Sequence, residues 1–228
     1  GKPGKALDNA YHNLRMAVAD AYPTQGGDPK PRLLQEIIRD GLTPSVPTDY
    51  ERWQPLHWIL AVPDVMQNGG FDAIVGNPPF RGGQHLTGDH GSNVRDWYVN
   101  TLAAGRRGSA DLVAYFFLRA SLLLATRGTL GLIATNTIAQ GATREVGLDH
   151  MAATGFTITR AIQSRSWPSS SANLEYAAVW GTGAALGQHS ELISDDMPVR
   201  RISTLLESAG RMEGTPFRLT ENLGIAFQ

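Results

Sequence analysis

The first 68 residues contain two stretches in which hydrophobic residues recur at helical spacing. One predicted helix ends at Pro23, and its apolar positions are Leu7, Tyr11, Leu14, Val18 and Ala21. A second helix is predicted from Pro31 to Arg39, because the glycine two positions later can end it. Residues 43–55 contain three prolines and indicate a loop. We therefore interpret residues 1–68 as an N-terminal segment of helices and loops.

Beyond residue 69, short apolar runs alternate with longer stretches of helical periodicity. The helical stretches extend from Ser109 or Asp111 to about Thr126, and from Thr143 to Thr154. The apolar runs predict buried strands at residues 71–76, 129–135, 156–162 and 174–180. This alternation predicts an α/β fold with a parallel, doubly wound sheet, in which the last pair of strands can be antiparallel. We assign the sheet to residues 69–183.

The remaining stretches lack a regular pattern. Residues 81–93 are polar and rich in glycine, which predicts a long loop after the first strand. A second polar loop is predicted at residues 164–173. Regularity fades from Gly181, and we interpret residues 184–228 as a connector toward a further domain. The chain has no initiator methionine, and we expect it to be a fragment.

The sharpest chemical signal is the tetrapeptide Asn77-Pro78-Pro79-Phe80, which directly follows the first predicted strand. Ligands of open α/β sheets bind at the carboxyl ends of strands. Two consecutive prolines cannot continue a strand, and they hold the backbone rigid. The alternative is that Asn-Pro-Pro is simply a turn that ends the strand.

This tetrapeptide has the groups that methylation of an exocyclic amine requires. The lone pair of such an amine on adenine is delocalised into the ring, so the nitrogen is a poor nucleophile. The side-chain oxygen of Asn77 and the carbonyl of Pro78 can accept both amine hydrogens and localise that lone pair. Phe80 can stack on a base that has been flipped out of the duplex. The pattern therefore predicts these four residues as the catalytic set.

Residues 70–80 resemble the catalytic motif of the gamma-group adenine-N6 DNA methyltransferases of restriction–modification and phage-defence systems. The likeness is to the large single-chain methylases, and it continues at residues 56–65, 109–117, 128–136 and 166–174. It implies a class I, Rossmann-like methyltransferase fold with S-adenosylmethionine as cofactor. It also implies double-stranded DNA as a partner, with other defence-system subunits as a further expectation. By this resemblance the chain carries the catalytic half of the enzyme.

The resemblance also suggests roles for residues outside the tetrapeptide. Trp167 takes the position of a second aromatic residue that holds the flipped base, although it could equally cover the edge of the sheet. Asn77 and the turn beside Asp111 would face the cofactor, but we favour Asp111 as the cap of its helix. Contacts to DNA phosphates are predicted for Arg81, Arg95, Arg106 and Arg107, with solvated loop arginines as the alternative.

The sequence departs from this family in its cofactor motifs. Residues 1–70 contain neither a glycine-rich turn between a strand and a helix nor the acidic residue that binds the ribose. We therefore expect the cofactor-binding strands to lie elsewhere, and this chain alone to bind S-adenosylmethionine weakly and not to methylate. Two rival hypotheses remain. One is a methyltransferase acting on RNA or protein glutamine, and the other is a methylase-like module that only binds DNA or a partner.

Charge and composition limit which partners and ligands the chain can bind. The net charge of −1 gives no overall electrostatic attraction to nucleic acid, so DNA must be met by local arginine clusters. The chain has no cysteine, which excludes disulfides and thiolate metal sites, and its histidines lack metal-ligand spacing, so we predict no metal. No apolar run is long enough to cross a bilayer. We expect a cytoplasmic protein with no membrane partner.

Overall fold

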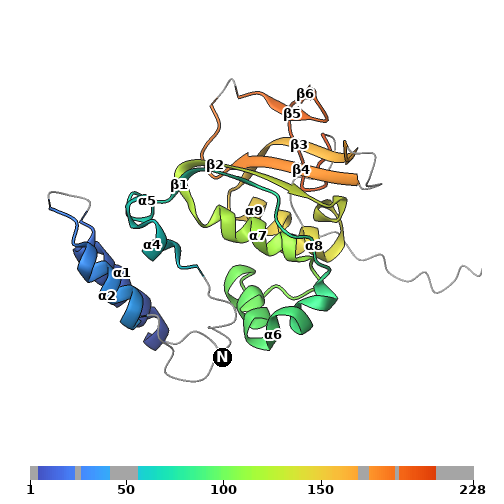
Figure 1. Ribbon diagram of the computed structural model, residues 1–228. Coiled ribbons are helices and arrows are strands. Elements are labelled where there is room, and N and C mark those ends of the chain that lie inside the picture. Colours follow the sequence, from blue (N-terminus) through green and yellow to red (C-terminus); the bar gives the residue numbers. More distant parts are fainter. Residues whose placement is uncertain (1–4, 24–26, 42–55, 169–174, 188–189, 209–228) are drawn as a thin grey trace, which may run out of the picture.

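The computed structural model describes residues 5–23, 27–41, 56–168, 175–187 and 190–208 (Figure 1). Its first elements are the helices α1 (Lys5–Ala21) and α2 (Pro31–Gly41), which lie side by side. An ion pair of 2.8 Å between Lys30 Nζ and Asp20 Oδ1 joins the start of α2 to the end of α1. Both helices predicted from hydrophobic spacing in the N-terminal segment are confirmed.

Two short helices connect this pair to the sheet. They are α4 (Trp58–Ala61) and α5 (Pro63–Gln67). The Gln67 side chain donates a 3.1 Å hydrogen bond to the carbonyl of Val18, which ties α5 to α1. The ring of Trp58 packs edge-on against Phe71, with ring centroids 5.3 Å apart. The N-terminal segment is therefore attached to the first residue of the sheet.

Six strands of the described residues form one mixed sheet. β1 (Phe71–Gly76) is parallel to β2 (Leu124–Ala134), and β4 (Glu175–Thr182) lies between β2 and β3 (Thr157–Ser166), antiparallel to both. The order across the sheet is β1-β2-β4-β3-β5-β6. β1, β2 and β3 thus run in one direction, and β4 runs in the other. The α/β class and the antiparallel last pair are confirmed.

A short hairpin continues the sheet beyond β3. β5 (Leu192–Ser194) is parallel to β3, and β6 (Met197–Val199) returns beside it. The turn places Asp195 and Asp196 at φ 48° and 65°, the left-handed region that two-residue hairpin turns require. We expected regularity to fade from Gly181, and the sequence analysis did not predict this hairpin. Strands of three residues carry too little pattern to be recognised, and pairing with β3 is what stabilises them.

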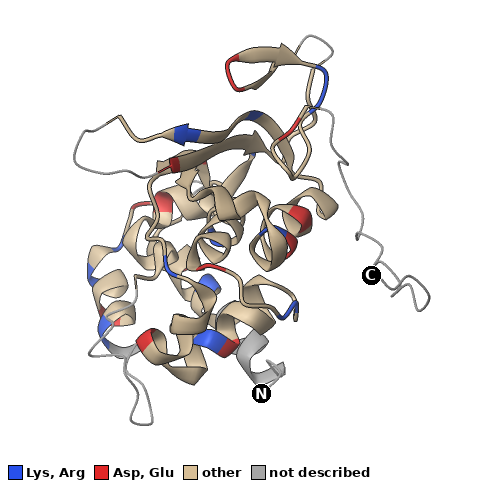
Figure 2. Ribbon diagram, turned by 90° about the vertical axis from the view of Figure 1, so that its right-hand side faces the viewer, with Lys and Arg blue, Asp and Glu red and all other residues tan. Residues whose placement is uncertain are grey.

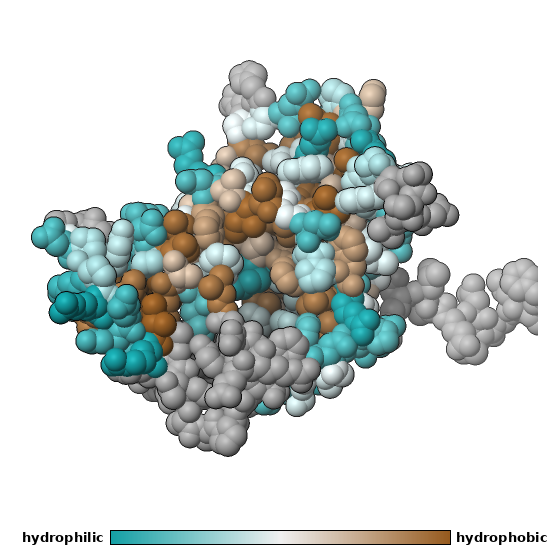
Figure 3. Space-filling view, viewed as in Figure 1, coloured by the Kyte–Doolittle hydropathy of each residue, from teal (hydrophilic) through white to brown (hydrophobic). Residues whose placement is uncertain are grey.

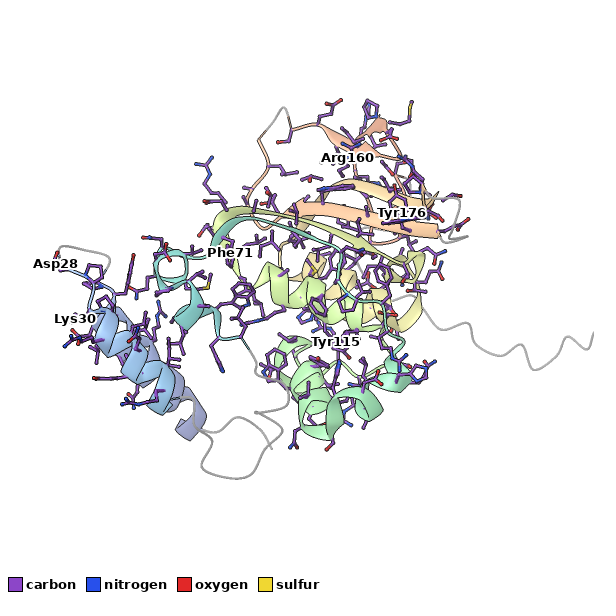
Figure 4. All side chains as sticks on the ribbon, viewed as in Figure 1. Asp28, Lys30, Phe71, Tyr115, Arg160 and Tyr176 are labelled. Carbon is purple, nitrogen blue, oxygen red and sulfur yellow. The ribbon has the colours of Figure 1, made fainter. Side chains whose placement is uncertain are left out.

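Two arginines of β3 hold this hairpin in place. Arg160 and Arg165 donate to the two carboxylate oxygens of Asp196, at 2.9 and 2.6 Å. Arg160 also lies over the ring of Trp180, 5.3 Å from the ring centre, on the upper side of the sheet in Figure 4. The hairpin is therefore part of the same body as the sheet.

Three helices cover one face of the sheet, the lower face in Figure 1. They are α7 (Leu112–Ser121), α8 (Gly141–Val146) and α9 (Leu148–Ala153). Their apolar side chains meet those of β2 and β4 in one continuous core, because alternate strand residues point to the same face. The largest fully buried side chains of this core include Tyr115, Phe117, Leu130, Leu148, Met151 and Val179.

The first strand is not buried on both faces, contrary to the sequence-based expectation. β1 lies at the edge of the sheet with β2 as its neighbour, and the Val75 side chain is 79% exposed. Register places Val75 beside Gly131, on the face opposite the three helices. Figure 3 shows hydrophobic residues gathered over β1, β2 and the helices beside them. The apolar sequence of β1 was read correctly as a strand, but an edge strand without a covering layer stays exposed.

The glycine-rich stretch after the tetrapeptide is largely helical, so the predicted loop at residues 81–93 was wrong. It contains the 3-10 turn η1 (Gly83–His85) and the helix α6 (Leu86–Trp97), followed by the π-helical turn η2 (Tyr98–Leu102). The helix is interrupted at Gly91, where φ is 80°. Leu86 is completely buried in the core. Tertiary burial of such anchors outweighs the low helix propensity of glycine.

Two helix boundaries also differ from the sequence-based expectation. α7 ends at Ser121 rather than near Thr126, because Phe71 pairs with Leu124 and draws that segment into β2. The predicted helix at residues 143–154 is divided into α8 and α9 at Gly147, whose ψ of −92° is not helical. A contact with another part of the fold ends α7, whereas the backbone conformation of a glycine separates α8 from α9.

Candidate active site

The carboxyl ends of three strands lie together along one side of the sheet. We call this side the site edge, and it is distinct from the lateral edge formed by β1. Asn77 follows β1, Thr135 follows β2 and Trp167 follows β3, and these strands share one direction. Tyr176, near the start of β4, marks the same edge in Figure 4, far from Phe71 at the opposite edge. This edge is where ligands of open α/β sheets bind. We take it as the candidate site.

The tetrapeptide alternates between exposed and buried positions. Asn77 and Pro79 are exposed, Pro78 is buried, and Phe80 is partly buried against the hydrophobic core. A buried proline ring anchors the backbone, and its fixed φ limits how the chain can move. The Asn77 side chain is therefore directed outward at the strand end rather than into the interior.

The chain leaving the tetrapeptide is bound to the start of α7. The backbone N–H of Arg81 donates to Asp111 Oδ1 at 3.1 Å, and the Arg81 carbonyl accepts from the N–H of Leu112 at 2.9 Å. Gly83 passes so close to this turn that a Cβ there would lie 2.5 Å from the carbonyl oxygen of Ala110. Only glycine fits at such an approach.

Asp111 caps α7, as we favoured from the sequence. Its Oδ1 accepts a 3.0 Å hydrogen bond from the N–H of Val113, and its backbone is extended. The N–H of Asp111 itself donates to Thr143 Oγ1 at 3.1 Å, at the start of α8. Thr143 was missed by the sequence analysis, and no local pattern marks it, because the bond links residues that are far apart in the sequence.

Two of the four predicted phosphate-binding arginines have partners within the protein. Arg81 forms a bidentate ion pair with Asp89: its Nε donates to Oδ2, and its Nη2 donates to Oδ1 at 3.0 Å. Arg95 donates to the carbonyl of Gly108 at 3.0 Å. Arg106 and Arg107 are exposed. Figure 2 shows basic and acidic residues interspersed over this side of the molecule, so any contact to a phosphate would be local.

Trp167 packs against a second aromatic residue of the site edge. Its ring is edge-on to Tyr176, with centroids 5.4 Å apart. β3 lies three strand positions from β1, which corresponds to a lateral separation of roughly 14 Å. Trp167 and Phe80 are thus on one edge of the sheet, with the ends of β2 and β4 between them.

An aromatic cluster supports the helical stretch beside the site. Tyr98 stacks on Tyr115 with ring centroids 5.0 Å apart, and the Tyr98 hydroxyl lies 3.1 Å from His90 Nδ1. Burial raises the pKa of both tyrosines above the ordinary value, so both hydroxyls are protonated at neutral pH. The sequence analysis did not single out this cluster. It fixes α6 and η2 against α7, next to the turn that holds Arg81.

The described residues contain neither a candidate metal site nor a candidate membrane span. No group of three or more His, Cys, Asp or Glu side chains in that part of the chain is placed to hold a metal ion. None of the helices found there combines the length and the apolar character that a membrane span needs.

Similar proteins are found among solved structures and among protein families. No curated protein matches the chain. Among solved structures 31 chains match, including the type IIL restriction-modification enzyme MmeI in complex with DNA, at 18% identity and a TM-score of 0.47. That match covers 60% of this chain and 19% of the MmeI chain, so the chain spans about a fifth of that enzyme's length.

The family assignment comes from a match that covers more than half of the chain. The family described as Eco57I restriction-modification methylase matches residues 10–158, which include β1, the tetrapeptide, α7 and β2. β4 lies antiparallel between β2 and β3, as in the Rossmann-like methyltransferase fold. The described helices cover one face of this sheet. The chain belongs to the Eco57I restriction-modification methylase family.

Proposed function

We propose that this chain carries the catalytic half of an S-adenosylmethionine-dependent DNA methyltransferase that modifies the N6 amino group of adenine. The observation that carries the proposal is the exposed Asn77 at the carboxyl end of β1, beside the buried Pro78, in a chain of a restriction–modification methylase family. The enzyme would act in restriction–modification or another form of phage defence, in the cytoplasm.

The tetrapeptide would activate the amine through two hydrogen-bond acceptors. Asn77 Oδ1 and the Pro78 carbonyl would accept the two N6 hydrogens, and the nitrogen would become more tetrahedral. Its lone pair would then be available, and the fixed dipoles of the two oxygens would stabilise the positive charge that develops. Bound S-adenosylmethionine would supply the methyl group as an electrophile and leave as S-adenosylhomocysteine. The nitrogen would then lose one proton to water, because neither amide oxygen is basic enough to keep it.

Aromatic rings would hold the base while this happens. Phe80 would stack on the flipped adenine from the tetrapeptide itself, and Trp167 would contact the extruded nucleotide from the end of β3. Arg106 and Arg107, both exposed, are the better placed of the four arginines for contacts to phosphates, since Arg81 and Arg95 already bind within the protein.

The residues present do not by themselves fit the whole cofactor. The sequence before β1 has no glycine-rich turn between a strand and a helix, and β1 is an apolar parallel strand at an exposed edge. Parallel strands are normally covered on both faces. We therefore propose that the cofactor-binding half pairs a strand with β1 and covers the exposed face beside it, and that this chain alone binds S-adenosylmethionine weakly.

The decisive experiment measures transfer of a radiolabelled methyl group by the intact protein to duplex DNA, RNA and protein. Label is expected in duplex DNA, and digestion to nucleosides should place it in N6-methyladenine. Asn77→Ala should abolish transfer while binding to DNA persists. Label in RNA or in glutamine would instead support the first rival hypothesis. Restriction or defence activity that survives unchanged in Asn77→Ala would support a module that only binds.

A further inference from the structure

The catalytic tetrapeptide has few hydrogen bonds of its own with which to hold its shape. Pro78 and Pro79 have no N–H groups, so they cannot take part as donors in a strand or a turn. At its first end the loop is fixed by Gly76, which pairs with Leu132 of β2. At its second end the next residue is Arg81. The position of the acceptor groups therefore depends on what holds these two ends.

Arg81 is held on both of its backbone polar atoms. Its N–H donates to Asp111 Oδ1 and its carbonyl accepts from Leu112 N–H, at 3.1 and 2.9 Å. These two bonds join the end of the tetrapeptide to the first turn of α7. The Arg81 side chain is not needed for either bond, because it points to Asp89 instead.

The same aspartate also fixes two other elements. Asp111 Oδ1 accepts from Val113 N–H, which caps α7, and Asp111 N–H donates to Thr143 Oγ1 at the start of α8. One carboxylate oxygen thus bridges the helix cap and the catalytic loop. A shift of α7 relative to the sheet would be transmitted directly to Phe80 and, through the stiff prolines, to Asn77.

We infer that Asp111 is a positioning residue that holds the catalytic tetrapeptide through the backbone of Arg81. This inference rests on the proposed methyltransferase function and adds a role that differs from cofactor binding. Catalysis of group transfer is sensitive to such positioning, since a displacement of about 1 Å can lower the rate about 100-fold.

Three substitutions of Asp111 in the intact protein separate the positioning role from a helix cap and from a cofactor ligand. Asp111→Asn keeps an oxygen at the same place and can accept both hydrogen bonds. Asp111→Ser keeps a good helix cap, but its oxygen lies one bond closer to the backbone and cannot also reach Arg81. Asp111→Ala removes both bonds. Ile158→Val, in the core at β3, is the control for a modest loss of stability.

Positioning by Asp111 predicts a specific pattern in the methylation kinetics. Asp111→Ala and Asp111→Ser should lower kcat by about 10- to 100-fold with the KM for S-adenosylmethionine unchanged, while Asp111→Asn and Ile158→Val stay near wild type. A raised KM with normal kcat would show a cofactor ligand and overturn the inference. A normal kcat in Asp111→Ser with a reduced one in Asp111→Ala would reduce the role to a helix cap, which also overturns it.

Amide hydrogen exchange tests the same contact without any activity. In Asp111→Ser the amide of Arg81 should exchange faster than in the wild type, and in Asp111→Asn it should not. Unchanged exchange in Asp111→Ser would overturn the inference even if the protein methylates DNA. Faster exchange in a protein that transfers no methyl group would support the contact and contradict the proposed function instead.

Discussion

β1 and β4 are both short apolar strands, yet they differ in how deeply they are buried. β4 lies between two neighbours and buries Ala177 and Val179 completely, whereas β1 lies at the edge and exposes most of Val75. Their sequences alone would not separate them. The comparison shows that burial of a strand is decided by the neighbours that flank and cover it. β1 combines the sequence of an interior strand with the position of an edge strand, at the point where the candidate site begins.

The largest expected effect comes from placing a charge in each strand. Val179→Asp should lower the free energy of unfolding by about 3–5 kcal/mol, because the carboxylate would be buried without a partner. Val75→Asp should change it by no more than about 0.5 kcal/mol in this chain, since the side chain is in water. Chemical denaturation measures both. Equal losses would contradict the contrast between the two strands.

The Val75→Asp variant of the intact protein also tests the proposal that the cofactor-binding half pairs with β1. If the cofactor-binding half pairs a strand with β1 and also covers the outer face of the sheet, Val75→Asp should weaken binding of S-adenosylmethionine, because the charge would then be buried. Calorimetric titration with the cofactor measures this. Wild-type affinity in Val75→Asp would argue that β1 remains an exposed edge.

The next largest effect is on the rate of methylation, and it compares the residue after β1 with the first residue of β4. Asn77→Ala at the end of β1 should lower kcat by about 100- to 1000-fold in the intact protein, since one of two fixed acceptors is lost. Its thermal unfolding should be unchanged, because Asn77 is exposed. Glu175→Ala, at the same edge but on β4, is the matched control and should leave kcat unchanged. A similar loss in both variants would point to general disturbance of the edge.

A smaller effect is expected at the aromatic residue after β3. Trp167→Ala should weaken binding of DNA with a flipped or mismatched adenine by about 1–3 kcal/mol, the range for stacking of a base on an aromatic side chain. Trp167→Phe should restore most of it. Fluorescence titration with 2-aminopurine at the target position measures the change. If Trp167 only covers the edge beside Tyr176, binding will be unaffected while stability falls.

The smallest effect is a pH dependence on the covered side of the sheet. Burial, with a smaller contribution from the positive charge of Arg106, lowers the pKa of His150 from its ordinary value of 6.5. The unfolded chain therefore binds a proton at a pH where the folded chain does not. This part of the stability is complete above pH 6.5 and falls as the pH drops below it. Thermal unfolding from pH 7.5 to 5 should show a smaller decrease in His150→Leu than in wild type.

Local patterns predicted the candidate site and several of the elements. The apolar run before the tetrapeptide predicted a strand, and the prolines fixed where it ends. The acidic residue at position 111 predicted a helix cap, which the Val113 bond confirms. These features are encoded within a few residues, because they depend on backbone conformation and on hydrogen bonds between near neighbours.

Only the tertiary structure decided how these pieces are combined. Burial of Leu86 stabilises a helix in a glycine-rich stretch. Pairing of Phe71 with Leu124 ends α7 before the residue expected from the sequence. The edge position of β1, and the bond from Arg81 to Asp111 that joins the loop after β1 to α7, link residues far apart in the chain. The sequence specified the conformations of short segments and the chemistry of the tetrapeptide. Strand order and burial depend on distant partners, and no short window of the sequence contains both members of such a pair.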